Sequence, residues 1–222
     1  MESCAILSLV PAPLVAVALY ALLRYKYPKG KFGLLHKTFL LGMAGILPVF
    51  AIDKLIAILH LDSLHSLNRT LFYAFALTGA VFELWKFLIL RMFVYPSKLV
   101  AKSIDVIIYS VIIAAGFTTA YSIYALYFAP SFIDLCQYAL TVGPAFVLIS
   151  VIMGYFTGIA LKRDYPVVDM MTGLFLAIVF QGIYRFCILT SDSILLYLSM
   201  FGILVIGITL MRISLRENPD SN

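Results

Sequence analysis

The sequence contains repeated runs of about twenty mostly apolar residues, and this feature restricts the possible folds more than any other. An α-helix of that length crosses the ~30 Å hydrocarbon core of a bilayer. Lipid offers no hydrogen-bond partners to the backbone of an open strand, so continuous apolar runs of this kind must be helical. The sequence therefore predicts an all-α fold, a polytopic membrane helix bundle.

The number of apolar runs predicts about seven transmembrane helices. They cover approximately residues 4–23, 37–60, 70–94, 104–128, 132–161, 167–189 and 193–211. The first run has no charged segment before it and no small-residue cleavage site, so we interpret it as a helix and not as a removable signal peptide. We expect residues 1–212 to form a single transmembrane domain and residues 213–222 to form a polar C-terminal tail.

The net charge of +5 is not a signal for nucleic-acid binding. Only 12% of the residues are charged and the mean hydropathy is +1.04, so the expected partner is the lipid bilayer and not a nucleic acid. The basic residues lie in short loops and form no basic stripe interleaved with aromatic residues. The three cysteines have neither metal-ligand nor redox-motif spacing, and the sequence gives no reason to expect a metal or another cofactor.

The basic residues alternate between successive loops, which predicts the orientation of the chain. Of the 16 lysines and arginines, 12 lie in every second loop and in the tail: Arg24, Lys26, Lys29, Lys31, Lys37, Arg91, Lys98, Lys102, Lys162, Arg163, Arg212 and Arg216. The intervening loops contain Arg69 as their one basic residue. Because cytoplasmic loops carry the excess of basic residues, we expect a multi-pass membrane protein with its N-terminus outside and its C-terminus in the cytoplasm.

Charged and polar residues interrupt the apolar spans at a few positions, and the segment "VFELWKF" at residues 81–87 is the clearest case. An ionisable residue at membrane depth costs roughly 2.5–3.5 kcal/mol on insertion scales, so it suggests a function. Glu83 and Lys86 are one turn apart and share a helix face, where pairing lowers that cost without any catalysis. We expect both side chains to point into the bundle, toward the fourth and sixth spans, because lipid gives neither charge a partner.

Several longer segments resemble the helices of one known family. "LVPAPLVAVALYALLRYKYPKG" and "LLGMAGILPVF" resemble its opening, a Pro-containing helix, a basic loop and a helix with a Gly-rich entry. Its signature helices are matched by "GAVFELWKFLILRMFVYPSK", "SIDVIIYSVIIAAGFTTAYSIYALYF", "VGPAFVLISVIMGYFTGIAL" and "GLFLAIVFQGIYRF". Over roughly residues 8–188 the chain therefore resembles the PrsW family of intramembrane proteases, which shares a superfamily with the CAAX prenyl endopeptidases.

The chain departs from this family at most of the positions that carry its chemistry. In the family motif E-E-x-x-K, Phe82 replaces the first glutamate, while Glu83 and Lys86 remain. Tyr121 and Ser122 stand where the motif G-F-x-x-x-E-N has its Glu-Asn pair. The position of one family histidine falls near Phe146, and Gln181 replaces the other. The resemblance implies hydrolysis of peptide bonds by glutamates and histidines that activate a water molecule.

These departures favour a PrsW-like intramembrane protease fold that has lost most of its catalytic residues. In this interpretation the chain is a non-catalytic binding or regulatory protein, a pseudoprotease, in which Glu83 and Lys86 are the remnant of the catalytic motif. Tyr121, Ser122, Gln181 and Arg185 are the candidate binding residues for a membrane-protein segment or another partner protein.

Two alternatives remain open at this point. The first is an active PrsW-like protease that works with a reduced site at Glu83 and Lys86. The second is a small transporter or channel subunit in which Glu83, Lys86 and Arg185 line a polar path. The sequence has no inverted repeat and no matched pair of broken helices, which are typical of transporters.

The predicted orientation can be tested by cysteine accessibility. We expect a cysteine at residue 30, in the first basic loop, to react with a membrane-impermeant reagent only from the cytoplasmic side. A cysteine at Asp192, in a loop without basic residues, is the matched control and should react from outside. Labelling of residue 30 from the outer face would overturn the topology.

Overall fold

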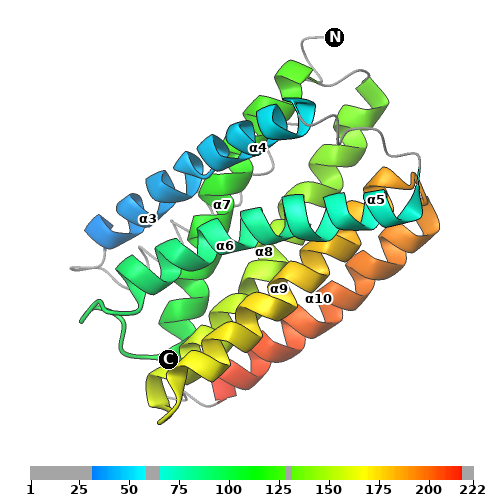
Figure 1. The fold of residues 1–222 in the computed structure, drawn as a ribbon. Helices are drawn as coiled ribbons and strands as arrows, with labels where there is room; N and C mark the ends of the chain where they lie inside the picture. The colour runs from blue at the N-terminus through cyan, green and yellow to red at the C-terminus, as the bar shows by residue number, and fades with distance from the viewer. Residues whose placement is uncertain (1–31, 59–65, 129–131, 217–222) are drawn as a thin grey trace.

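A computed structural model describes residues 32–58, 66–128 and 132–216 of the chain, and the elements within these residues are helices (Figure 1). Six of the resulting spans are long and apolar enough to cross a membrane. This confirms the predicted all-α, polytopic bundle. The expected span at residues 4–23 lies outside the described residues.

The second and third predicted spans are each interrupted. The second span consists of α3 (Phe32–Ala44) and α4 (Ile46–Ile58), which are separated at Gly45. The third span alternates between α-helical and π-helical hydrogen bonding and contains two π-helical segments. Its segments are α5 (Leu67–Phe72), the π-helix η1 (Tyr73–Gly79), α6 (Ala80–Ile89) and the π-helix η2 (Leu90–Val94).

The remaining four spans are long helices whose bounds almost coincide with the predicted ones. They are α7 (Ser103–Phe128), α8 (Phe132–Ile159) with the short 3-10 helix η3 (Ala160–Lys162), α9 (Pro166–Leu189) and α10 (Ser193–Arg216). The last helix continues to Arg216, so the first residues of the expected polar tail are helical. The other residues of that tail lie outside the described part of the chain.

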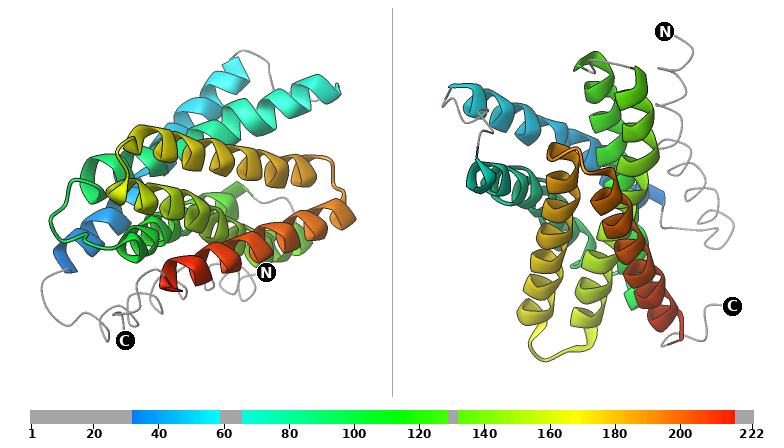
Figure 2. Two further views of the ribbon diagram at one scale, coloured as in Figure 1. Left: turned by 90° about the horizontal axis from the view of Figure 1, so that it is seen from below. Right: turned by 90° about the vertical axis from the view of Figure 1, so that its right-hand side faces the viewer.

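Helix α7 lies at the centre of the bundle, between α3 and α8 (Figure 2). It is apolar on all sides, which is typical of a helix that is surrounded by other helices. Two of its hydroxyl groups bond within the helix itself: Thr118 and Thr119 donate to the carbonyls of Ala114 and Ala115. Helices α9 and α10 lie side by side at the outside of the bundle, and many of their large apolar side chains are exposed where lipid would surround them (Figure 1).

Small residues allow the central helices to approach each other closely, as expected when apolar surface alone cannot drive association in lipid. Gly42 of α3 lies against the carbonyl of Ile113, and Gly116 of α7 lies against the carbonyl of Phe39. The two backbones are therefore in direct contact. On the opposite side of α7, the Ser103 hydroxyl donates to the carbonyl of Gly158 in α8 at 2.9 Å.

We expect Gly116→Ala to destabilise the protein, because the new methyl group would overlap the Phe39 carbonyl. Overpacking of this kind costs about 1–3 kcal/mol. The midpoint of thermal unfolding in detergent measures the effect. Gly202→Ala in α10 is the matched control, since no atom lies within 4 Å of the added Cβ, and it should leave the midpoint unchanged or raise it. Equal midpoints for the two variants would contradict the contact between α3 and α7.

Candidate functional site

The Glu83 and Lys86 side chains of α6 form the polar centre of the bundle. Both have 0% exposed surface, and Glu83 Oε1 lies 2.5 Å from Lys86 Nζ. The spacing of three residues places both groups on one face of the helix, as the sequence predicts. Lipid gives neither charge a partner, so the face that carries them turns toward the other helices.

Lys86 also contacts helix α8. Its ammonium group donates to the Ser150 hydroxyl at 3.4 Å and lies 4.9 Å from the centre of the Phe146 ring. Ser110 of α7 in turn donates to the backbone carbonyl of Ser150 at 2.7 Å. The ammonium therefore has an anionic, a hydroxyl and an aromatic neighbour, each of a kind that binds cations in proteins.

Ser150 is the site residue that the sequence analysis missed. The expectation was that Lys86 faces the fourth and sixth spans, whereas the contacts described for its ammonium group outside its own helix are to the fifth span, α8. The signal that would have found Ser150 is its position four residues after Phe146, on the same face of α8.

Two buried acceptor groups in this part of the bundle have no hydrogen-bond partner among the described residues. They are the Glu83 carboxylate, which is paired only electrostatically with Lys86, and the side-chain carbonyl of Gln181. Gln181 lies on α9 and is 1% exposed. A Cβ on Gly79, one turn before Glu83, would lie 3.2 Å from the carbonyl oxygen of Ile178 and 3.3 Å from the backbone nitrogen of Gly182. The helices that carry Glu83 and Gln181 are therefore in contact at this level.

Aromatic rings from three helices meet beside the ion pair. Phe82 precedes Glu83 on α6, and its ring centre lies 5.1 Å from Phe117, 5.4 Å from Tyr121 and 5.9 Å from Phe146. Phe117 and Phe146 are stacked, with 5.4 Å between their centres. All four residues are buried. We call Phe82, Phe117, Tyr121 and Phe146 the aromatic cluster.

The other residues predicted for the site lie on the same helices. Ser122 follows Tyr121 on α7 and is 8% exposed. Arg185 lies one turn after Gln181 on α9 and is partly buried. Its neighbour Tyr184 is fully buried and shares a 2.9 Å hydrogen bond with Thr141 of α8. The structure thus brings Tyr121 against the residue beside Glu83, while the roles proposed for Ser122, Gln181 and Arg185 stay predictions.

The chemistry of the side chains around Glu83 does not fit a metal ion. Among the described residues, no group of three His, Cys, Asp or Glu side chains is arranged to hold one. The contacts of the ion pair are instead an ammonium group, a serine hydroxyl and aromatic carbon. The ammonium of Lys86 occupies the place of a cation beside the carboxylate and would repel a second one.

The fold and this centre define a class: a multi-pass helical membrane protein in which a charged pair, Glu83 and Lys86, is buried inside the bundle, within one of the spans. The profile of the PrsW family intramembrane metalloproteases matches residues 30–211, so the chain belongs to the PrsW family. It is 27% identical over 189 residues to Protease PrsW of Shouchella clausii (strain KSM-K16), and the alignment covers 84% of each protein. No solved structure matches the chain.

The burial of both charges predicts how substitutions at the ion pair change the stability of the protein. Removing one partner of a buried pair leaves the other charge uncompensated and costs about 3–5 kcal/mol. We therefore expect Lys86→Met to lower the folded yield and the unfolding midpoint more than the double change Glu83→Gln with Lys86→Met, which leaves no charge at the site. Size-exclusion chromatography in detergent and a thermal unfolding curve measure both quantities. The prediction fails if the double variant is no more stable than Lys86→Met.

Proposed function

We propose that this chain is a non-catalytic member of the PrsW family, a pseudoprotease that binds or regulates another membrane protein. The chain belongs to this family, and what we propose is that its site has lost the chemistry of a protease. The partner is a membrane-embedded segment, because the described residues that surround the site belong to spans within the bilayer.

The aromatic cluster is the observation that carries the proposal. Phe82, Tyr121 and Phe146 stand at the positions where the resemblance to the family places two glutamates and a histidine. Their rings are buried against one another, with centres between 5.4 and 6.1 Å apart. Peptide hydrolysis needs a water molecule and groups that move its protons. Packed rings at these three positions supply neither, and they exclude water from the space that they fill.

The remaining carboxylate is poorly suited to act alone. The Lys86 ammonium lies 2.5 Å from Glu83 Oε1 and competes with a water molecule for that oxygen. Catalytic groups that act as a unit are strongly non-additive, and losing several of them removes nearly all of the acceleration. Glu83 and Lys86 instead serve as a buried polar contact that fixes α6 against α8.

A reduced protease is the second candidate, and one observation favours it. The Glu83 carboxylate and the Gln181 carbonyl are buried acceptors without a hydrogen-bond donor among the described residues. Buried polar groups of this kind are commonly satisfied by an internal water molecule. A water held by Glu83 would be a nucleophile beside its general base. This candidate requires Glu83 for activity, whereas the pseudoprotease does not.

The two candidates differ in the effect of Glu83→Gln. The first test mixes the purified protein in liposomes with a panel of single-span membrane proteins. We expect no cleavage product whose formation depends on Glu83. Protease PrsW of Shouchella clausii, assayed in parallel, is the positive control for the assay. In cells that lack the gene, Glu83→Gln should restore the normal phenotype as well as the unmodified protein does, at equal membrane levels.

Gln181→Leu provides the matched variant for the second candidate. A reproducible product that is made by the unmodified protein and lost in both Glu83→Gln and Gln181→Leu would overturn the pseudoprotease proposal. Thermal unfolding of each variant separates such a loss from a failure to fold.

A further inference from the structure

The second membrane span is broken at Gly45, and the sequence around the break explains why. The Gly45 amide donates to the carbonyl of Gly42 at 3.0 Å, a contact one residue tighter than in an α-helix. Pro48, in the first turn of α4, has no amide hydrogen and leaves the Ala44 carbonyl without its usual partner. The helical hydrogen bonds are therefore interrupted between α3 and α4.

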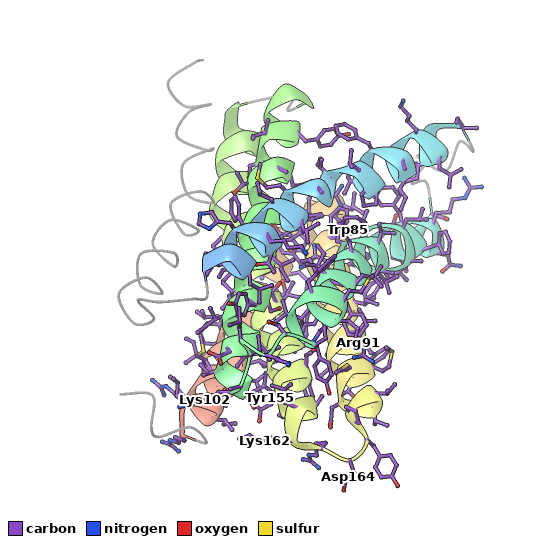
Figure 3. The ribbon with its side chains drawn as sticks, turned by 90° about the vertical axis from the view of Figure 1, so that its left-hand side faces the viewer. Trp85, Arg91, Lys102, Tyr155, Lys162 and Asp164 are labelled. Carbon is purple, nitrogen blue, oxygen red and sulfur yellow. The ribbon has the colours of Figure 1, made fainter. Side chains whose placement is uncertain are left out.

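Trp85 of α6 occupies this break. Its indole N–H donates to the backbone carbonyl of Leu41 at 3.2 Å, across 44 residues of sequence (Figure 3). A Cβ added at Gly45 would lie 2.6 Å from the Trp85 ring and 2.5 Å from that of Phe117. Glycine therefore leaves the space that the indole fills. Trp85 lies between Glu83 and Lys86 in the sequence, so one helix carries both the ion pair and this contact.

The two halves of the second span are held very differently. α3 is in backbone contact with α7, through Gly42 at Ile113 and Gly116 at Phe39. Among the α4 side chains that the structure describes, Val49 and Ile56 are the buried ones, and α4 lies at the edge of the bundle (Figure 2). A few side-chain contacts are easier to open than a backbone interface.

Helix α4 also covers the aromatic cluster. Val49 packs with Phe82, Phe117 and Tyr121 in one buried group of side chains. One residue later, the Phe50 ring meets Tyr124 edge to face with 4.7 Å between the centres, and Phe50 is 40% exposed. Any outward movement of α4 would separate Val49 from the aromatic cluster and expose the rings of the cluster toward lipid.

We infer that Gly45 is a hinge about which α4 swings away from the bundle, and that the packing of Val49 against Phe82, Phe117 and Tyr121 is the contact that holds it closed. The hydrogen bond from Trp85 to Leu41 holds the end of α3, on the side of the hinge that does not move. α3 stays fixed to α7 during this movement. The hinge governs access from the bilayer to the aromatic cluster. That access serves partner binding only if the proposed function is correct, whereas the hinge itself is tested without any partner.

Distances between spin labels test the movement directly. Cys4, Cys136 and Cys187 are first replaced by alanine, and labels are placed at exposed positions: Leu55→Cys on α4, Leu40→Cys on α3 and Tyr197→Cys on α10 as the common reference. The protein is measured in lipid nanodiscs. We expect Val49→Ala, which removes part of the contact between α4 and the aromatic cluster, to add a second, displaced peak to the 55–197 distance. The 40–197 distance should not change.

A matched control separates the loss of this contact from a general loosening of the bundle. Val106→Ala shrinks another buried valine, in α7 and outside the group of side chains that packs with Val49, and should leave both distances as they are. If Val49→Ala does not fold, the unmodified chain still tests the hinge, because its 55–197 distribution should be broader than its 40–197 distribution. Equal widths there, parallel changes in both distances, no change in Val49→Ala, or the same second peak in Val106→Ala would each overturn the inference.

Discussion

A carboxylate and an ammonium group lie 2.5 Å apart with no exposed surface, in a protein whose surroundings are largely hydrocarbon. Neither group can be hydrated by bulk water, so the helix that carries them has one permitted orientation, toward its neighbours. That orientation places Phe82 among the rings of α7 and α8 and Lys86 against Ser150. The neutralisation of two buried charges thus fixes how α6 packs, and with it the position of the whole site.

The same constraint, the lack of water, explains how the central helices are joined. Hydroxyl groups of α7 donate to backbone carbonyls of α8, from Ser103 to Gly158 and from Ser110 to Ser150. Glycines let the backbones approach closely enough for such bonds to form. In the third span, the Thr78 hydroxyl donates to the Ala74 carbonyl within the π-helix that precedes α6. Departures from α-helical geometry are tolerated where such local bonds satisfy the backbone.

The short helix α6 contributes side chains to the ion pair, to the aromatic cluster and to the contact at the break in the second span. Phe82 enters the aromatic cluster, Glu83 and Lys86 form the pair, and Trp85 reaches the break in the second span. Glu83 and Lys86 share one face, whereas Trp85 points to another neighbour because consecutive residues are about 100° apart around a helix. In the pseudoprotease and hinge that we propose, this helix would keep its place in the bundle while it serves packing and movement.

The sequence alone determined the membrane-spanning helices, because only a helix satisfies its own backbone within lipid. It also placed Glu83 and Lys86 on one face, since their spacing is close to one helical turn. It did not determine that Lys86 meets Ser150, that rings far apart in the sequence converge, or that Trp85 fills the break at Gly45. Those contacts depend on which face of each helix meets a neighbour. Lipid and protein interior are equally apolar, so a helix such as α7 carries no hydropathy pattern that distinguishes a face toward lipid from a face toward protein. Tertiary packing alone therefore decided these contacts.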